Sequence, residues 1–125
     1  MFWKGPVFTK TGFKGQGIDL ENCEIIETLN GKEDGVIIPL FRNCHTHLGD
    51  SLARKELPKN LNLNELVGPS GWKHKWLAKN DLNKSIIHGL KEVISSGTGL
   101  VMDFREGGEA GLQLFDDLEY PGTVI

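Results

Sequence analysis

The sequence predicts an α/β fold, and three observations lead to it. Short β-like segments separated by turn residues fill positions 1–35. From 36 to 125, apolar runs typical of buried strands alternate with segments of helical periodicity. Their order is strand, helix, strand, helix and strand start, which is typical of right-handed βαβ units and a parallel sheet. We therefore expect a small β-sheet segment at 1–35 and βα units at 36–125.

The first part is predicted to form a small antiparallel sheet. Glycine and proline interrupt its strand-like segments, and Asn30-Gly31 is a strong turn signal. None of these segments is long enough to be stable alone, so we expect them to pair with one another. The expected segments are 3–8, 11–17, 18–20 and 23–29.

The second part is predicted to open with a strand over 36–41. Its apolar run is continuous rather than alternating, which favours a strand buried on both faces. Pro39 cannot donate to a sheet ladder, so it fits the start of that strand better than its middle. A long connection, 48–79, follows with one short helical turn expected at 63–67, and loops of that length are often functional.

The clearest predicted helix begins after Asn80 or Asp81 and ends near Gly97. Both Asn and Asp are good N-cap residues, and apolar residues then recur at helical spacing up to position 94. Glycine is a common residue just after a helix end. The remaining expected elements are a strand at 99–104, a helix over 112–118 and the opening of a third strand at 123–125.

Composition excludes several classes of function. The 125 residues hold 14 basic and 17 acidic side chains, and this net charge of −3 argues against a nucleic-acid partner. No apolar run approaches the ~18 residues of a membrane span, and the first residues lack the apolar core of a secretory signal. Two cysteines, Cys23 and Cys44, are too few for a disulfide scaffold. We expect free thiols and a cytoplasmic location without membrane contact.

His45 and His47 form the motif that carries chemistry. In an extended chain, residues i and i+2 point to the same face, so both imidazoles can reach one cation. The pair follows a predicted buried strand, and parallel α/β folds place active sites at the carboxyl ends of their strands. A His-X-His pattern alone also occurs by chance, and it is this location that favours a metal site. Cys44 is expected to point to the opposite face.

Two segments resemble the amidohydrolase superfamily, in its cytosine deaminase, dihydroorotase and hydantoinase branch. The segment 36–48, VIIPLFRNCHTHL, is similar to the family's first barrel strand, which ends in His-Thr-His. The segment 96–104, SGTGLVMDF, is similar to the second strand, Gly-x-Thr-x-x-x-Asp. The β-rich first part suits the small β-sandwich that precedes the barrel in this family. The resemblance implies the first βα units of a TIM-type (β/α)8 barrel.

The family resemblance also implies a chemistry and its limits. It assigns His45 and His47 as metal ligands, for zinc or alternatively iron or manganese, and it assigns no catalytic residue. The family's remaining ligands and catalytic Asp lie on later strands, and a complete barrel needs ~250 residues. We therefore expect an incomplete barrel that is catalytically deficient alone. The sequence also departs from the family pattern at Leu40, where glycine is usual.

Several other residues keep two interpretations at this point. Asp50 either orients an imidazole or forms a turn. His74 belongs either to a loop over the metal site or to a surface turn. Asp103 lies either near the metal or bonded to a neighbour such as Arg105, because an unpaired inward carboxylate would be costly. Arg105 and Glu106 form either a substrate contact or a solvated ion pair.

Two functions follow from these expectations. The first is the N-terminal part of a metal-dependent hydrolase that acts on C–N bonds of a small molecule, by cyclic amide hydrolysis or deamination. The second is a non-catalytic metal-binding or assembly module. Open sheet edges tend to pair with another chain, so a homo-oligomer or a complementing chain is expected as partner.

Overall fold

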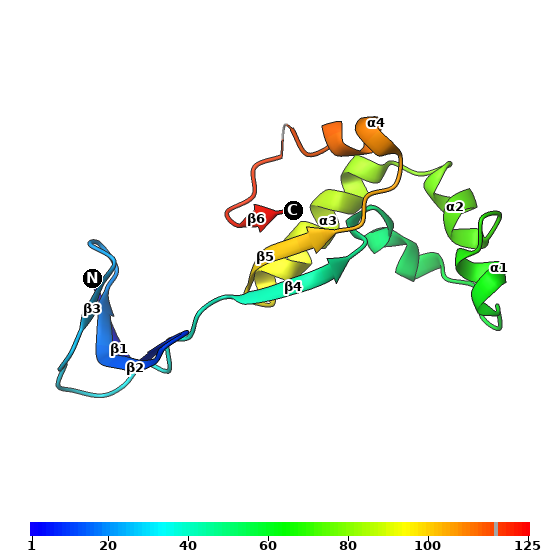
Figure 1. The fold of residues 1–125 in the computed structure, drawn as a ribbon. Coiled ribbons are helices and arrows are strands. Elements are labelled where there is room, and N and C mark those ends of the chain that lie inside the picture. The colour runs from blue at the N-terminus through cyan, green and yellow to red at the C-terminus, as the bar shows by residue number, and fades with distance from the viewer. Residues whose placement is uncertain (117) are drawn as a thin grey trace. The chain divides into compact units, whose positions relative to one another are not determined.

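A computed structural model describes residues 1–116 and 118–125, and the chain divides into two compact units (Figure 1). The first unit is Met1–Leu40 and the second is Phe41–Ile125. The division therefore falls after Leu40, whereas the sequence placed it after Gly35. Backbone hydrogen bonds explain the difference: the Ile37 amide donates to the Pro6 carbonyl, and the Ile37 carbonyl accepts from the Phe8 amide.

The first unit is a meander of three antiparallel strands. These strands are β1 (Phe2–Thr9), β2 (Gly12–Asp19) and β3 (Glu24–Ile26), and they lie in the order β1-β2-β3. Gly5 has a φ of +148°, and a Cβ there would overlap the Gly35 carbonyl, so glycine permits this close approach. Within residues 1–40, all of which the structure describes, there is one sheet, in place of the expected sandwich.

The first strand of the second unit differs from its prediction. Strand β4 spans Phe41–Thr46, so the expected start at Val36 was wrong. The expected burial on both faces was also wrong, because Phe41 is 58% exposed and only Thr46 of this strand is buried. The physical reason is its position: β4 pairs only with β5 (Thr98–Asp103) and forms an edge of the described sheet.

The parallel pairing expected from the alternation is present. The sheet has the order β4-β5-β6, with β6 at Thr123–Val124, and both pairings are parallel. Helix α3 (Leu82–Ser95) connects β4 to β5, and its N-cap is Asp81, whose carboxylate accepts from the Lys84 amide at 3.2 Å. Helix α4 (Gly108–Gln113) connects β5 to β6 and begins earlier than predicted.

The connection over 48–79 contains three short helices, whereas one short helical turn was expected. They are the 3₁₀ helix η1 (Leu48–Glu56), α1 (Leu63–Val67) and α2 (Trp72–Leu77). The helical turn expected at 63–67 is confirmed as α1, which begins with a capping box of Asn62 and Glu65. Helices η1 and α2 bury apolar side chains and therefore hold the connection against the rest of the unit, whereas α1 buries none.

The core of the second unit lies between the sheet and its helices. Leu48, Ile86, Leu90 and Val101 are at most 4% exposed and form one cluster. Ala53, Trp76 and Leu77 form a second cluster under η1 and α2. Helix α3 lies along one face of β4 and β5 in Figure 1, which leaves the carboxyl ends of both strands at one end of the unit.

The structure also bears on the expectations about the cysteines and about membrane-spanning helices. Cys23 and Cys44 are free, exposed thiols, as expected. No helix within the described ranges has the length and apolar character needed to cross a membrane.

Candidate functional site: a histidine pair at the ends of two parallel strands

His45 and His47 point toward one another at the end of β4. Their Nε2 atoms are 3.3 Å apart, and their ring centroids are separated by 5.2 Å. The register between β4 and β5 shifts between Asn43 and Thr46, and the Asn43 side chain accepts from the His45 amide at 3.1 Å. This irregularity changes the direction in which side chains at the end of β4 point, as β-bulges commonly do.

Phe104 supports both imidazoles from the neighbouring strand. Its ring centroid lies 4.6 Å from that of His45 and 5.7 Å from that of His47, with tilted planes. Phe104 directly follows β5 and is 50% exposed, so the histidine pair lies on an aromatic surface at the rim of the sheet. The contact restricts the rotation of both rings.

Asp103 connects β5 to the backbone on either side of His47. Its Oδ1 accepts from the Thr46 hydroxyl at 3.0 Å and from the Leu48 amide at 2.7 Å. The Thr46 hydroxyl also lies 3.1 Å from the Met102 carbonyl. The carboxylate therefore fixes the path of the chain through His47, and the interpretation of Asp103 as bonded to neighbours is the one that the geometry supports.

Arg105 is buried, so the interpretation of a solvated Arg105–Glu106 pair was wrong for the arginine. Its side chain is 3% exposed, its Nη1 lies 3.6 Å from Oδ2 of Asp103, and its Nη2 donates to Glu106 at 2.7 Å. A Cβ at Gly49 would overlap the guanidinium, so glycine lets η1 pass close over this side chain. Arg105 thus connects the end of β5 with η1.

Lys73 brings three elements together beside His47. Its ammonium lies 2.9 Å from Asp50 of η1 and 2.7 Å from Glu106, which follows β5. It also lies 3.4 Å from Nδ1 of His47, and that same nitrogen is 3.8 Å from Oε1 of Glu106. The Lys73 side chain is 13% exposed, so solvent screens these contacts only partly.

The charges in this cluster stabilise one another. Burial disfavours the ammonium of Lys73, but the hydrogen bonds that it donates to Glu106 and Asp50, together with the negative charges of both carboxylates, outweigh this effect, and the pKa of Lys73 is raised. Burial likewise acts to raise the pKa of Glu106, but the hydrogen bond from Lys73, a backbone hydrogen bond and the positive charges of Lys73 and Arg105 together outweigh it, so the pKa of Glu106 is lowered. Both groups are therefore charged near neutral pH.

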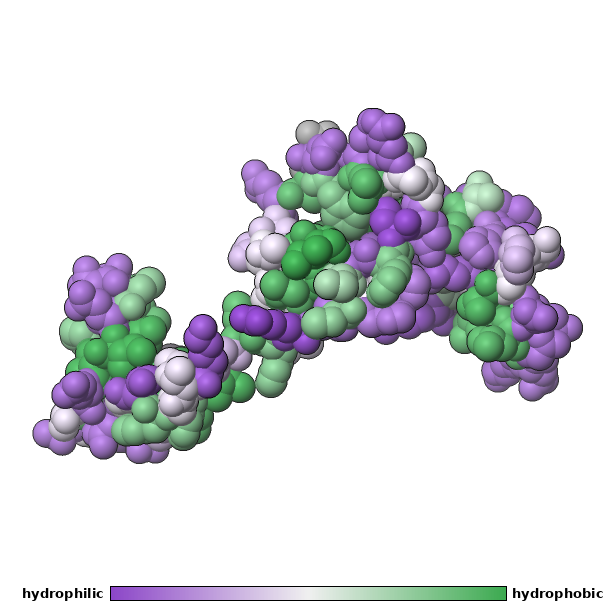
Figure 2. Space-filling view, in the orientation of Figure 1, coloured by the Kyte–Doolittle hydropathy of each residue, from purple (hydrophilic) through white to green (hydrophobic). Residues whose placement is uncertain are grey.

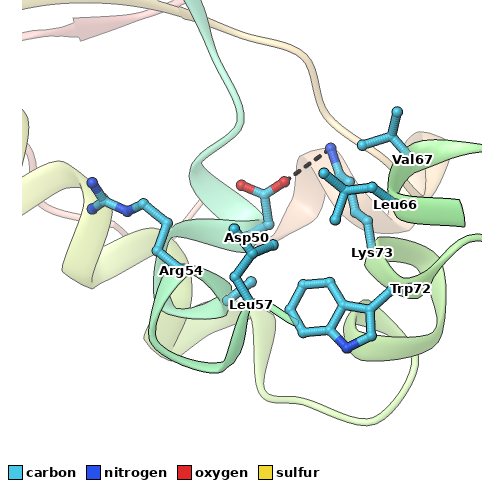
Figure 3. A pocket seen from close by; sticks show the side chains of 8 residues that line it. Asp50, Arg54, Leu57, Leu66, Val67, Trp72 and Lys73 are labelled. Atoms are coloured by element: carbon cyan, nitrogen blue, oxygen red, sulfur yellow. Dashed lines mark ion pairs between the residues drawn. The ribbon is translucent and has the colours of Figure 1, made fainter. Parts of the chain in front are cut away.

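A mostly apolar cavity of about 140 Å³ lies next to the same cluster (Figure 3). The ion pair of Asp50 and Lys73 forms part of its wall, and the Trp72 ring faces it. A second cavity, of about 230 Å³, reaches His47 itself and shares Asp50 and Arg54 with the first. The lining of the first cavity is Asp50, Ala53, Arg54, Leu57, Leu66, Val67, Trp72 and Lys73.

The other histidines lie away from this cluster. His74 is exposed on the last turn of α2, and His88 on α3 lies 3.6 Å from Glu92 one turn later. Asp50, for which two interpretations were open, is in the first turn of η1 and binds Lys73. The functional residue that the sequence analysis missed is Lys73. The analysis singled out the adjacent His74, and no spacing of residues in the sequence indicates that α2 places Lys73 beside His47.

The separation of the two imidazole nitrogens fits a shared cation. Two nitrogens at about 2.0–2.1 Å from one zinc ion, at a tetrahedral angle, lie about 3.3–3.4 Å apart. The 3.3 Å between the Nε2 atoms agrees with that value. In the described part of the chain, no cluster of three or more His, Cys, Asp or Glu side chains has a geometry suited to a metal. The pair alone could therefore supply at most two of the four positions of a tetrahedral site.

Three curated proteins of archaea are similar to this chain. A "putative aminohydrolase" of Archaeoglobus fulgidus is 36% identical over 120 residues, which cover 94% of this chain and 36% of that protein. An uncharacterised protein of Methanocaldococcus jannaschii is 31% identical and matches 98% of this chain and 33% of its own length. A "putative aminohydrolase" of Methanothermobacter thermautotrophicus is 30% identical over 98 residues, 72% of this chain and 25% of its own length.

The chain therefore spans about a third or less of the length of these relatives. No family model matches the sequence, and no solved structure matches it significantly. Two of the three relatives carry the name of a hydrolase, and this similarity extends over most of the present chain.

Proposed function

We propose that this chain is the N-terminal part of a metal-dependent hydrolase of the amidohydrolase superfamily that acts on a C–N bond of a small molecule. The supporting observation is the convergence of His45 and His47 at the carboxyl ends of two parallel strands, with their Nε2 atoms 3.3 Å apart. The similarity to proteins named as aminohydrolases supports the same class. The βαβ units at 41–125 would then be the first of a TIM-type barrel.

His45 and His47 would hold the divalent cation, with zinc as the first choice and iron or manganese as alternatives. Such a cation would lower the pKa of a bound water to about 7 and so provide a nucleophile at neutral pH. Phe104 limits the rotation of both rings, and Asp103 fixes the backbone at His47. The substrate would be a cyclic amide or an amino-substituted heterocycle, and its leaving nitrogen needs a proton from an acid.

The acid and the remaining ligands would come from outside this chain. The relatives are about three times as long as the region that they share with it, which leaves room for those groups in the whole protein. The 125-residue chain is accordingly expected to bind a cation and to lack turnover. Ammonia release from a panel of cyclic amides and aminoheterocycles tests this, and turnover typical of an intact enzyme would contradict the proposed division of roles.

Metal binding gives the direct test. Zinc uptake by the purified chain is measured by competition with a chromophoric chelator, for the unaltered chain and for His45→Gln and His47→Gln. Both variants are expected to lose the bound zinc. His74→Gln and His88→Gln serve as matched controls because these histidines lie on helices away from the pair, and both should retain it. Zinc binding that survives the double change of His45 and His47 would exclude the site.

The sheet edges support a second candidate, a non-catalytic assembly module. Among the described residues, β4 and β6 are edge strands, and apolar side chains remain exposed beside them. Figure 2 shows hydrophobic surface over the β5 and β6 region of the second unit. Phe41, Met102 and Phe104 are 58%, 38% and 50% exposed. A second chain pairing with β4 would cover such residues, as exposed edges favour.

The two candidate functions predict different oligomeric states of the chain in solution. Light scattering coupled to gel filtration measures its mass with and without zinc. Under the assembly proposal, a homo-oligomer is expected that dissociates when Phe41→Asp places a charge at the edge of β4. A monomer that binds zinc through the histidines favours the hydrolase proposal.

A further inference from the structure

The cavity in Figure 3 is an apolar space bordered by three short helices. Its apolar lining comes from η1 and the residue after it (Ala53, Leu57), from α1 (Leu66, Val67) and from α2 (Trp72). Its volume of about 140 Å³ is close to that of apolar protein cavities of about 150 Å³ that bind benzene. Pockets for whole drug-sized ligands measure about 300–1,000 Å³. The cavity therefore has the size for one small ring.

A tight turn and core packing hold the walls of this cavity. In the turn between α1 and α2, the Gly71 amide donates to the Gly68 carbonyl at 2.7 Å. A Cβ at Gly68 would overlap the Asn64 carbonyl, so glycine allows the turn to close. On η1, Ala53 is 5% exposed and packs in one cluster with Trp76. The space is thus set by the fold of the chain itself.

The charged side chains around the cavity are bound to partners. The Lys73 ammonium lies 2.9 Å from the Asp50 carboxylate. Arg54 forms an ion pair with Glu92, and its Nε donates to the Ser51 carbonyl at 3.3 Å. A further charge buried here would cost free energy, because these charges already neutralise one another and most of the remaining lining is apolar. The cavity is therefore suited to an uncharged, apolar group.

We propose that this cavity binds a neutral hydrophobic ring, of about the size of benzene, that the substrate carries near the C–N bond to be hydrolysed. Lys73 forms part of the cavity wall and also lies 3.4 Å from Nδ1 of His47, so one side chain separates the cavity from the histidine pair. The second cavity, which reaches His47, shares Asp50 and Arg54 with the first. A ligand that crosses this shared wall occupies both cavities.

Apolar and aromatic contacts supply the binding energy of the ring. The Trp72 side chain faces the cavity, so an aromatic occupant packs against its ring. Leu57 and Val67 are 50% and 43% exposed, and the bound ring removes part of their apolar surface from water. That the ring belongs to a substrate rests on the proposed function, whereas the binding of a ring in this cavity does not.

Three small probes that share one ring and differ in charge test the proposal: toluene, benzoate and benzylamine. NMR of the zinc-free chain follows the indole N–H of Trp72 and the methyl groups of Ala53, Leu66 and Val67. Toluene should shift these signals in a saturable way. Benzoate and benzylamine should bind more weakly by about tenfold or more, because each would bring a charge into an apolar space.

A pair of variants on α1 locates the bound probe. Leu66→Asn places a polar amide in the cavity wall and should weaken toluene binding by about tenfold or more. Leu63→Asn makes the same change on the same helix, at a position that is 75% exposed and outside the cavity lining, and should leave the affinity unchanged. Circular dichroism checks that both variants fold.

Three results would overturn the ring site. They are the absence of saturable toluene binding, equal affinities for the two α1 variants, and a charged probe that binds as tightly as toluene.

The outcomes also separate the ring site from the proposed function. If His45→Gln and His47→Gln abolish zinc uptake while toluene does not enter the cavity, the function stands and the ring site is wrong. If toluene binds as expected while the unaltered chain takes up no zinc, the ring site stands and its assignment to a hydrolase substrate is wrong.

Discussion

The two units of this chain use opposite strand arrangements, and only the second gathers polar groups at one place. Antiparallel β1, β2 and β3 are joined by short turns, so successive strand ends lie at opposite edges. Parallel β4 and β5 need a crossover, and their carboxyl ends meet at the same edge. His47, Asp103 and Glu106 are neighbours for that reason.

The crossover also supplies the core that the first unit lacks. Residues 48–95 contribute Leu48, Ile86 and Leu90 to a cluster with Val101. In the first unit, Val7 is the one buried hydrophobic residue, and all of residues 1–40 are described. The long connection between the parallel strands therefore provides most of the buried core of the second unit, and it also places Lys73 beside His47.

The largest expected effect on stability is in the core of the second unit. Ile86 is fully buried, so Ile86→Ala should lower the free energy of unfolding by about 2–5 kcal/mol, from lost burial and the cavity left behind. Urea denaturation measures it. Ile87→Ala, the next residue of α3 and 37% exposed, is the control. Equal losses would show that α3 does not pack as described.

A smaller effect is expected at the edge where the strands meet. Asp103→Asn weakens the acceptor of the Thr46 hydroxyl and Leu48 amide and should cost about 1.5–3 kcal/mol, the range for hydrogen bonds to charged groups. Urea denaturation gives the loss, and the Leu48 amide should exchange faster with solvent hydrogen. An unchanged exchange rate would contradict the role given to Asp103.

In the first unit, the corresponding test is Val7→Ala. It removes two buried methyl groups, worth about 1.6 kcal/mol at about 0.8 each. Faster hydrogen exchange of the β1 and β2 amides measures the loss. Val36→Ala, at a position that is 59% exposed, should leave those rates unchanged. If Val7→Ala lowered the free energy of unfolding as much as Ile86→Ala, the two units would not differ in how strongly their cores stabilise them.

The smallest expected effect is on pH dependence. The hydrogen bond from the Lys84 amide holds the pKa of Asp81 below its ordinary 3.8. A lowered pKa in the folded state gives stability that is present above the unfolded value and is lost as pH falls through the folded one. Thermal unfolding between pH 5 and pH 2 should therefore show Asp81→Asn losing less stability than the unaltered chain. Parallel curves would contradict this.

The prediction from sequence was best where the signal is local. The N-cap at Asp81, the helical spacing that follows and the turn at Gly97 placed α3, and the convergence of His45 and His47 follows from their i, i+2 spacing in an extended chain. The start of β4 was missed because Ile37 bonds to the first unit, which the apolar run itself does not show. The burial of Arg105 was missed because η1 covers it from far away in sequence.

The sequence by itself determined the pair of imidazoles and α3, because each depends on residues within a few positions of one another, and the order of strands and helices along the chain predicted the parallel pairing. Only the tertiary structure decided that Lys73 and Glu106 meet at His47 and that Asp103 holds its backbone. Those contacts join residues 26 to 59 positions apart, and their geometry is set by how the crossover packs on the sheet. Patterns of neighbouring residues in the sequence do not indicate how these distant segments pack.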